Sequence, residues 1–316
     1  MTIAFLFPGQ GSQAVGMGKA LADAFPEAKA TFDEADAALG FALTEVMWNG
    51  PEDALRATEN AQPALLAHSV AALRVLAARG VTPSAAAGHS LGEYSAHVAA
   101  GSLAFADAIR LVRRRGELMA EAGRVRPGAV AAILGLAGDA VETVCTAVTA
   151  GGKGTVVPAN FNSPGQVVLS GEIDAVEAAM LACKEAGAKR AIRLPVSGAF
   201  HSPLMGPAAE GLVAALAAVT VNDARCPVIA NVDARPVTAA ADIRDRLGRQ
   251  LLGAVRWEES MRHLVAEGTA AFVELGTGKV LRGLLRQIAP EARSANVDDP
   301  ASLDEALALV AQGAAS

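Results

Sequence analysis

The ten residues AAAGHSLGEY, Ala85–Tyr94, constrain the fold most, because they read as the end of a buried strand, a tight turn and a helix start. Within them, Gly88, Ser90 and Gly92 match the pattern G-x-S-x-G. A serine on such a strained turn presents its hydroxyl outwards, and the backbone around it packs so closely that glycine is needed on either side. The helix that follows directs free backbone N–H groups at whatever the hydroxyl attacks. The stretch therefore predicts Ser90 as a nucleophile with an anion site beside it.

The surrounding sequence supplies the context that this short pattern needs, since three fixed letters also occur by chance in a glycine-rich chain. Val81–Ala87 suits a short buried strand, and Glu93–Ala100 suits a helix. A second strand is predicted over Thr2–Phe7, and it runs directly into the glycine-rich turn PGQGSQ. That turn is either an ordinary strand-to-helix connection or the source of a second anion donor, the backbone N–H of Gln10. The residues alone leave both interpretations open.

Composition and charge narrow the class of protein. Of 316 residues, 52% are hydrophobic, yet the apolar runs are interrupted by charge, glycine or proline well short of a membrane-spanning length. The start has no basic segment of the kind that precedes a secretory signal, so we expect a cytoplasmic protein that does not bind membranes. The net charge of −6 argues against nucleic acid as a partner. Three scattered cysteines, Cys145, Cys183 and Cys226, indicate reduced thiols and no metal site.

The middle of the chain changes its pattern after the glycine- and proline-containing stretch 123–128, which we interpret as a domain boundary. There the expected order is strand, helix, two strands around an Asn-Ser-Pro-Gly turn, helix and strand, which is a ferredoxin-like βαββαβ unit. We therefore predict an α/β protein with a large domain formed by residues 1–126 and 197–316 and a small inserted domain at residues 127–196. Asn160 and Asn162 flank the turn, where they serve either turn geometry or the lining of a cleft between domains.

A serine nucleophile requires a base, because its hydroxyl is not ionised near neutral pH. The chain has five histidines. His201 is the one in a loop immediately after a predicted boundary, within VSGAFHSPLM, where the chain returns to the large domain. Of the others, His89 is next to Ser90 in the sequence, and three lie in predicted helices: His68, His97 and His263.

The predicted helix Ala104–Ala122 carries four arginines: Arg110, Arg113, Arg114 and Arg115. Such a set is usually a solvated face with scattered ion pairs. One member could instead reach inwards to a carboxylate ligand, because a guanidinium matches a carboxylate in a two-pronged hydrogen bond. Periodicity does not choose among them.

Taken together, PGQGSQ, GHSLGEY, the Arg115–Gly116 pair and FHSPLM resemble the malonyl-CoA:acyl carrier protein transacylases of fatty acid synthesis. The resemblance extends over essentially the whole chain, and the motifs agree in type, order and spacing. It implies an α/β-hydrolase-like large domain with a parallel sheet, a ferredoxin-like small domain, and an active site in the cleft between them.

The resemblance also implies a role for each matching residue. Ser90 corresponds to the nucleophile that carries the acyl group, and His201 to the general base and acid. Gln250, in GRQLLGAVRW, corresponds to the residue whose backbone carbonyl orients the histidine. Gln10 and Leu91 correspond to the backbone donors of the oxyanion hole. Arg115 matches the family's arginine that binds the malonyl carboxylate, and Phe200 matches a residue of malonyl-selective members. We expect Phe200, Asn160 and Asn162 to line the acyl pocket.

The implied activity is transfer of malonyl from malonyl-CoA to the phosphopantetheine thiol of acyl carrier protein through a malonyl-serine ester. The expected partners are malonyl-CoA and CoA, and transiently acyl carrier protein; the expected protein is a monomer with no bound cofactor. Two alternatives remain open at this point. One is a serine thioesterase or hydrolase using the same Ser90 and His201, and the other is a discrete malonyl transferase that serves a polyketide synthase.

Overall fold

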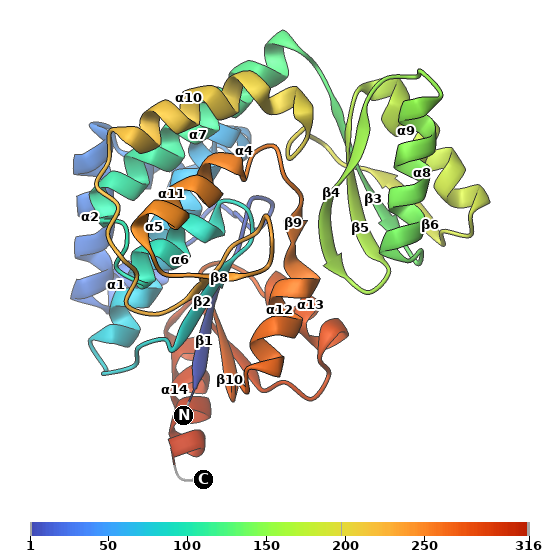
Figure 1. Cartoon of the computed structure of the whole chain (residues 1–316). Helices are drawn as coiled ribbons and strands as arrows, with labels where there is room; N and C mark the ends of the chain where they lie inside the picture. The colour runs from blue at the N-terminus through green and yellow to red at the C-terminus, as the bar shows by residue number, and fades with distance from the viewer. Residues whose placement is uncertain (1, 197, 315–316) are drawn as a thin grey trace.

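The computed structural model describes residues 2–196 and 198–314, and the chain has an α/β fold (Figure 1). The strands are β1 (Ile3–Phe7), β2 (Ala85–Gly88), β3 (Ala129–Leu134), β4 (Val156–Ser163), β5 (Gln166–Gly171), β6 (Arg190–Arg193), β7 (Val228–Ile229), β8 (Pro236–Val237), β9 (Val255–Arg256), β10 (Ala271–Leu275) and β11 (Ser294–Val297).

The helices lie between the strands for most of the chain. They are α1 (Lys19–Ala24), α2 (Pro26–Leu39), α3 (Leu43–Asn49), α4 (Glu52–Arg56), α5 (Thr58–Ala77), α6 (Gly92–Ala99), α7 (Phe105–Val125), α8 (Gly138–Ala150), α9 (Ile173–Glu185), the 3₁₀ turn η1 (Pro203–Met205), α10 (Gly206–Ala217), α11 (Ala240–Arg249), α12 (Trp257–Ala266), α13 (Val280–Ile288) and α14 (Pro300–Ala314).

The larger sheet has six strands within the described residues, in the order β11-β10-β1-β2-β7-β8. Neighbours from β11 to β7 pair in parallel, whereas β8 is antiparallel to β7. The prediction of a parallel sheet is thus wrong at this edge, because the two residues of β8 are too short to produce a sequence pattern. The strand predicted over Val81–Ala87 begins only at Ala85, since Pro83 has no N–H for a strand ladder.

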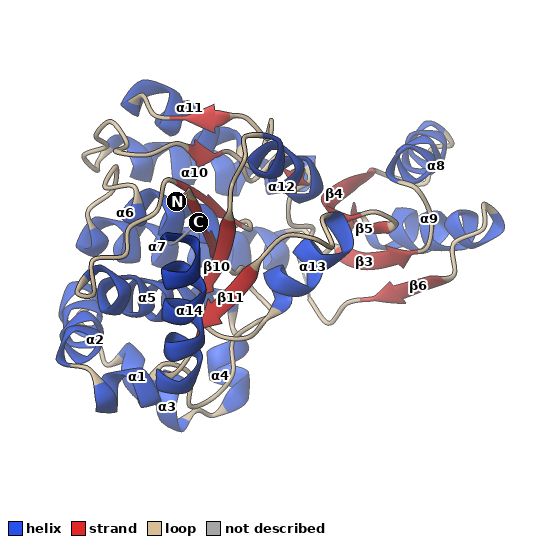
Figure 2. Cartoon of the chain, turned by 90° about the horizontal axis from the view of Figure 1, so that it is seen from below, coloured by secondary structure: helices blue, strands red, loops and turns tan. Residues whose placement is uncertain are grey.

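Both faces of the larger sheet are covered by helices (Figure 2). Side chains alternate along β1, and every one of its residues is buried. Phe5 and Phe7 pack into a core with α2, α5 and α7, while Leu6 packs on the other face with Trp257 of α12 and Leu285 of α13. This explains why the strand reads as a continuous apolar run, as buried parallel strands do.

The smaller sheet has the order β6-β3-β5-β4-β9, and α8 and α9 pack against it (Figure 1). The element order β3-α8-β4-β5-α9-β6 is the predicted one. The two-residue strand β9, which was not predicted, comes from later in the chain and pairs in parallel with β4. The boundary predicted at residues 196 and 197 stays a prediction, and Ser197 lies outside the described residues, as do the chain-end residues 1, 315 and 316.

Whether a helix can span a membrane depends on its length and hydropathy. Across residues 2–196 and 198–314, every helix is too short or too polar to cross a bilayer.

The turn between β2 and α6 is held by close backbone contacts. A Cβ added to Gly88 would lie 1.9 Å from the backbone of Gly92, and a Cβ added to Gly92 would lie 2.1 Å from the carbonyl oxygen of Phe7. Between them, Ser90 has a φ of 53°, in the left-handed region that non-glycine residues rarely occupy. The two glycines are therefore required by contact between backbones, and the serine between them is strained.

We predict that Gly88→Ala lowers the free energy of unfolding by about 3 kcal/mol or more, because the contacting atoms belong to the backbone and cannot rotate away. The matched control is Gly283→Ala in α13, where an added Cβ meets nothing within 4 Å. That change should leave stability unchanged or raise it by up to about 1 kcal/mol. Urea unfolding midpoints compare the three proteins, and equal midpoints for Gly88→Ala and the unsubstituted chain would contradict the steric account.

Candidate active site

A pocket of about 820 Å³ lies where the loops after β1 and β2 face β4, β5 and the segment that follows β6. Eight of the nine residues that the sequence predicts for the site line this pocket: Gln10, Ser90, Leu91, Arg115, Asn160, Asn162, Phe200 and His201. The ninth, Gln250, is fully buried behind the pocket wall. Residues from four distant parts of the chain thus surround one space.

Ser90 and His201 are in direct contact at the floor of this pocket. Ser90 Oγ lies 2.7 Å from His201 Nε2. On the other side of the ring, His201 Nδ1 lies 3.0 Å from the carbonyl oxygen of Gln250 and 3.1 Å from that of Gly253. Because carbonyl oxygens only accept hydrogen bonds, Nδ1 carries the proton and Nε2 is left to accept from the serine hydroxyl. The ring is therefore held in the tautomer that a base for Ser90 requires.

His201 is buried, with 5% of its surface exposed, and its backbone has a φ of 56°. Burial, and secondarily the positive charge of Arg115, lowers the pKa of His201 to about 3. The imidazole is consequently neutral at ordinary pH and able to accept a proton.

Arg115 projects from α7 towards the same hydroxyl and is 1% exposed. Its Nη2 donates to Ser90 Oγ and to Gln250 Oε1, each at 3.0 Å, and its Nη1 donates to Gln62 Oε1 at 2.8 Å. Among the described residues, its guanidinium forms no ion pair. The charge is therefore buried against neutral oxygen atoms.

The other three arginines of the predicted set pair with acidic side chains of the same helix and are more exposed. Arg110 pairs with Asp107, while Arg113 and Arg114 both pair with Glu117. The choice that periodicity left open is thus made by packing, and of the four candidates Arg115 is the one that lines the pocket.

Two further residues contact the nucleophile turn, and sequence reasoning missed both. Asn231 Oδ1 accepts the Ser90 backbone N–H at 2.7 Å, and Asn231 Nδ2 donates to the carbonyl of Gly88 at 2.7 Å. Glu93, in the first turn of α6, accepts from the Asn231 backbone N–H at 3.1 Å and from Gln250 Nε2 at 2.7 Å. A signal for Asn231 existed, since it lies two residues after β7 at the carboxyl edge of the larger sheet, where ligand sites form.

The two predicted oxyanion donors border the pocket beside the serine. In the described part of the chain, the backbone N–H groups of Gln10 and Leu91 donate to no other group, whereas that of Ser90 is occupied by Asn231. The side chain of Gln10 donates to Thr58 Oγ1 at 3.2 Å. Two backbone N–H groups at the pocket are thus available to a ligand within the described residues.

The opposite wall of the pocket comes from the smaller sheet and the loop before His201. Asn162 Oδ1 lies 2.8 Å from His89 Nε2, so the histidine next to the nucleophile is engaged with β4 and not with Ser90. Asn160 and Phe200 also line the wall. Among residues 2–196 and 198–314, no group of three or more His, Cys, Asp or Glu side chains is arranged to hold a metal ion.

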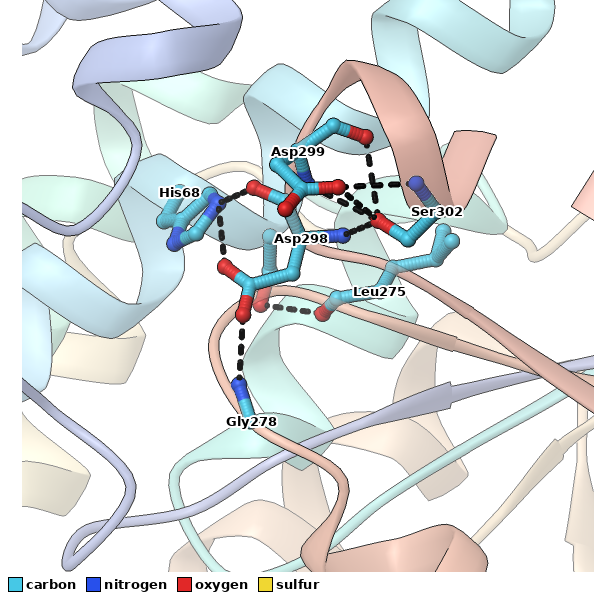
Figure 3. Close-up of polar contacts among 7 residues, drawn as sticks. His68, Leu275, Gly278, Asp298, Asp299 and Ser302 are labelled. Carbon is cyan, nitrogen blue, oxygen red and sulfur yellow. Dashed lines mark hydrogen bonds and ion pairs between the residues drawn. The ribbon is translucent and has the colours of Figure 1, made fainter. Parts of the chain in front are cut away.

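A second polar cluster, in which His68 is fully buried, fixes the loop that leads into α13 (Figure 3). His68 Nε2 lies 3.1 Å from the Asp298 carbonyl oxygen, and Asp298 Oδ2 accepts the backbone N–H of Gly278 at 3.1 Å. A few residues later, Val280 and Leu281 line the pocket. The cluster thus fixes one rim of the pocket from behind.

We predict that Ser90 stays nucleophilic in mild acid, because the lowered pKa keeps His201 neutral there. Labelling by phenylmethanesulfonyl fluoride, measured by intact mass, should keep its rate from pH 7 down to about pH 5. In Arg115→Ala, loss of the neighbouring positive charge should move the acid limb of the profile to higher pH. Ser90→Ala is the control for site of labelling. A rate that falls with a midpoint near 6.5 in the unsubstituted protein would contradict this account.

Comparison with known proteins was made for the sequence and for the structure. The family model described as "Acyl transferase domain" matches residues 4–298. The malonyl CoA-acyl carrier protein transacylase of Bacillus subtilis (strain 168) is 50% identical over 305 residues, covering 96% of each chain. The enzyme of the same name from Escherichia coli (strain K12) is 47% identical over 307 residues, covering 97% of this chain and 99% of its own.

Solved structures agree with these sequence matches. An acyl carrier protein S-malonyltransferase from Vibrio cholerae has a TM-score of 0.93 and 47% identity, covering 97% of this chain and 100% of its own. A malonyl-transacylase solved in complex with a type II PKS acyl-carrier protein has the same TM-score and identity, covering 97% and 99%. The chain therefore belongs to the acyl transferase domain family, within its malonyl CoA-acyl carrier protein transacylases.

Proposed function

We propose that this protein transfers the malonyl group from malonyl-CoA to the phosphopantetheine thiol of acyl carrier protein and so supplies extender units for fatty acid synthesis. One observation carries the proposal: a buried, unpaired arginine and a neutral histidine contact the same serine hydroxyl, Arg115 at 3.0 Å and His201 at 2.7 Å. The pair supplies a nucleophile and its base, and the arginine supplies a partner for an acyl group that ends in a carboxylate.

In the first half-reaction, His201 takes the hydroxyl proton as Ser90 attacks the thioester carbon of malonyl-CoA. The free N–H groups of Gln10 and Leu91 stabilise the oxyanion, each worth about 10²–10³ in rate by comparison with measured donors. The carbonyl of Gln250 holds the histidine ring throughout, in the place of a carboxylate. CoA then leaves as a thiol after accepting the proton from His201, and malonyl remains as an ester on Ser90.

In the second half-reaction, the phosphopantetheine thiol of acyl carrier protein gives its proton to His201 and attacks the malonyl ester. Collapse of the second oxyanion returns the proton to Ser90 and releases malonyl-carrier protein. The two substrates thus use one site in turn, which is ping-pong kinetics. Asn160, Asn162 and Phe200 form the wall of the acyl pocket, and the protein's own side chains supply the chemistry without a bound cofactor.

The architecture that we propose is an α/β-hydrolase-like domain of residues 1–126 and 197–316 that carries a ferredoxin-like domain at residues 127–196. The order β6-β3-β5-β4 in the smaller sheet supports the second assignment. The absence of a membrane-spanning helix among the described residues is compatible with the cytoplasmic monomer that we expect.

We predict that Ser90→Ala abolishes malonyl transfer, with a loss of about 10³-fold or more, because no acyl ester can form. Arg115→Ala should lower malonyl transfer by about 10²-fold while acetyl transfer holds or rises, since only malonyl loses an ion pair. Arg114→Ala, an exposed neighbour, is the matched control and should match the unsubstituted protein. The measurement is the rate of transfer of each acyl group to carrier protein. An equal loss of malonyl and acetyl transfer in Arg115→Ala would contradict the proposal that Arg115 binds the malonyl carboxylate.

We predict poor turnover of methylmalonyl-CoA, because the side chain of Phe200 leaves little room for a methyl group on the α-carbon. Phe200→Ala should raise methylmalonyl transfer relative to malonyl transfer by about tenfold, a value within the range for one methyl group in a pocket. Both thioesters are assayed at equal concentration. Comparable turnover of the two by the unsubstituted protein would contradict the prediction.

Two alternative functions are separated from this one by the acyl acceptor. A serine hydrolase would lose malonyl from Ser90 to water as fast as to carrier protein, whereas a transferase transfers it to the thiol much faster. A polyketide role has one specific observation in its favour, the likeness to a transacylase bound to a type II PKS acyl-carrier protein. Competition between fatty-acid and polyketide carrier proteins for the malonyl group distinguishes the two pathways.

A further inference from the structure

A buried carboxylate behind the nucleophile turn takes no part in the mechanism above. Glu93 is 1% exposed and lies in the first turn of α6. Its Oε2 accepts from the backbone N–H of Asn231 at 3.1 Å and from Gln250 Nε2 at 2.7 Å. Within the described residues, its other oxygen has no partner. Burial of a carboxylate costs folding free energy, which its hydrogen bonds to Asn231 and Gln250 offset in part.

The first group that Glu93 binds, Asn231, holds the nucleophile turn closed. The Asn231 side chain bonds the Ser90 N–H and the Gly88 carbonyl, each at 2.7 Å, and so spans the turn. Ser90 needs this support, because its φ of 53° is unfavourable for a side chain with a Cβ. Glu93 fixes the backbone of Asn231 and thereby places the amide that spans the turn.

The second group, the Gln250 side chain, meets both charged residues at once. Its Nε2 donates to Glu93 and to the Ser90 carbonyl oxygen at 2.9 Å, while its Oε1 accepts from Arg115 at 3.0 Å. An amide rotated by 180° would put its NH₂ against the guanidinium of Arg115, which has donors only, so that contact would be lost. The guanidinium therefore fixes the orientation in which Nε2 faces Glu93.

The backbone of Gln250 extends the connection to the base. Its carbonyl oxygen lies 3.0 Å from His201 Nδ1, on the residue whose side chain Glu93 and Arg115 hold. Displacement of that side chain would shift the carbonyl and with it the imidazole ring. A misplacement of about 1 Å at reacting groups can cost about 10²-fold in rate.

We propose that Glu93 is a positioning residue, which sets Ser90 through Asn231 and sets His201 and Arg115 through Gln250. The proposal rests on the acyl-transfer function argued above. Glu93 touches none of the reacting groups, so its removal is expected to slow acylation more than it weakens binding of malonyl-CoA. What positions these groups is a single oxygen, Glu93 Oε2, which accepts hydrogen bonds from both Asn231 and Gln250.

The experiment compares Glu93→Ala, Glu93→Gln and Glu93→Asp with the control His97→Ala. His97 lies one turn further along α6, is fully buried and bonds Ser102 Oγ at 2.9 Å, away from the site. The readout is the rate constant for malonyl-Ser90 formation at saturating malonyl-CoA, by rapid quench and intact mass. The KM for malonyl-CoA and the thermal midpoint are measured for each protein.

We expect Glu93→Ala to lower the acylation rate constant about 30- to 100-fold with a KM within about threefold. Glu93→Gln keeps an acceptor oxygen in place and should recover at least about tenfold of that loss. Glu93→Asp keeps the charge but is one CH₂ shorter, and it should be as slow as Glu93→Ala. His97→Ala should acylate within about threefold of the unsubstituted protein even if it loses as much stability.

Acylation of Glu93→Ala at the rate of His97→Ala would overturn the proposal. Should Glu93→Ala not fold, the comparison of Glu93→Gln with Glu93→Asp still decides it, since near-native rates for both would also overturn it. Failure of the function itself looks different: the unsubstituted protein would then form no malonyl-Ser90 at all.

Discussion

The contact between two stretches of backbone, the end of β1 and the start of α6, is the constraint on which the rest of the structure depends. Gly92 lies so close to the carbonyl of Phe7 that no side chain fits between them, and Gly88 lies equally close to Gly92. The serine between the glycines takes a left-handed backbone conformation, and its half-buried hydroxyl meets His201 and Arg115 in the pocket. Strain of this kind persists only where surrounding contacts over-determine it.

Those contacts form one connected polar network. The Asn231 side chain bonds both sides of the turn, and the Gln250 side chain donates to the Ser90 carbonyl. Glu93 accepts from the Asn231 backbone N–H and from the Gln250 side chain. All three side chains are buried, and this burial raises the pKa of Glu93 to about 7. Because a buried polar group without a hydrogen-bond partner costs free energy, the side-chain amides of Asn231 and Gln250 each have one favoured orientation. This in turn fixes the positions of Ser90 and Arg115, which they contact.

Electrostatics adds a second consequence of burial. Arg115 carries its charge into the interior, where amide and hydroxyl oxygens accept from its guanidinium and the ring of Tyr94 lies 5.7 Å away. It forms no ion pair among the described residues, so it retains a capacity to pair with an anion. The same charge adds to desolvation in lowering the pKa of His201. In the function that we propose, one cation binds the carboxylate of the acyl group and also adds to the desolvation that keeps the neighbouring base neutral. No carboxylate is needed beside the histidine, because two backbone carbonyl oxygens orient its ring.

The sequence by itself determined what is local. Steric demands within five residues identify Ser90, apolar runs and periodicity give the order of most helices and strands, and the loop position of His201 separates it from four other histidines. Resemblance to a family then supplied Arg115 and Gln250, which the pattern of residues did not distinguish. The short edge strands β8 and β9 were not predicted, since two residues are too few to show an alternating pattern.

Only the tertiary structure decided what depends on contacts across the chain. Arg115 faces the pocket and Arg114 does not, because packing of α7 buries one and exposes the other. Asn231 lies 141 residues from Ser90 in sequence, and its amide has no signature that sets it apart from a turn residue. The carbonyl that orients His201 is a group that every residue possesses, so composition and spacing carry no trace of which one is used. Long-range hydrogen-bond partners are chosen by the fold, and therefore they become visible only with it.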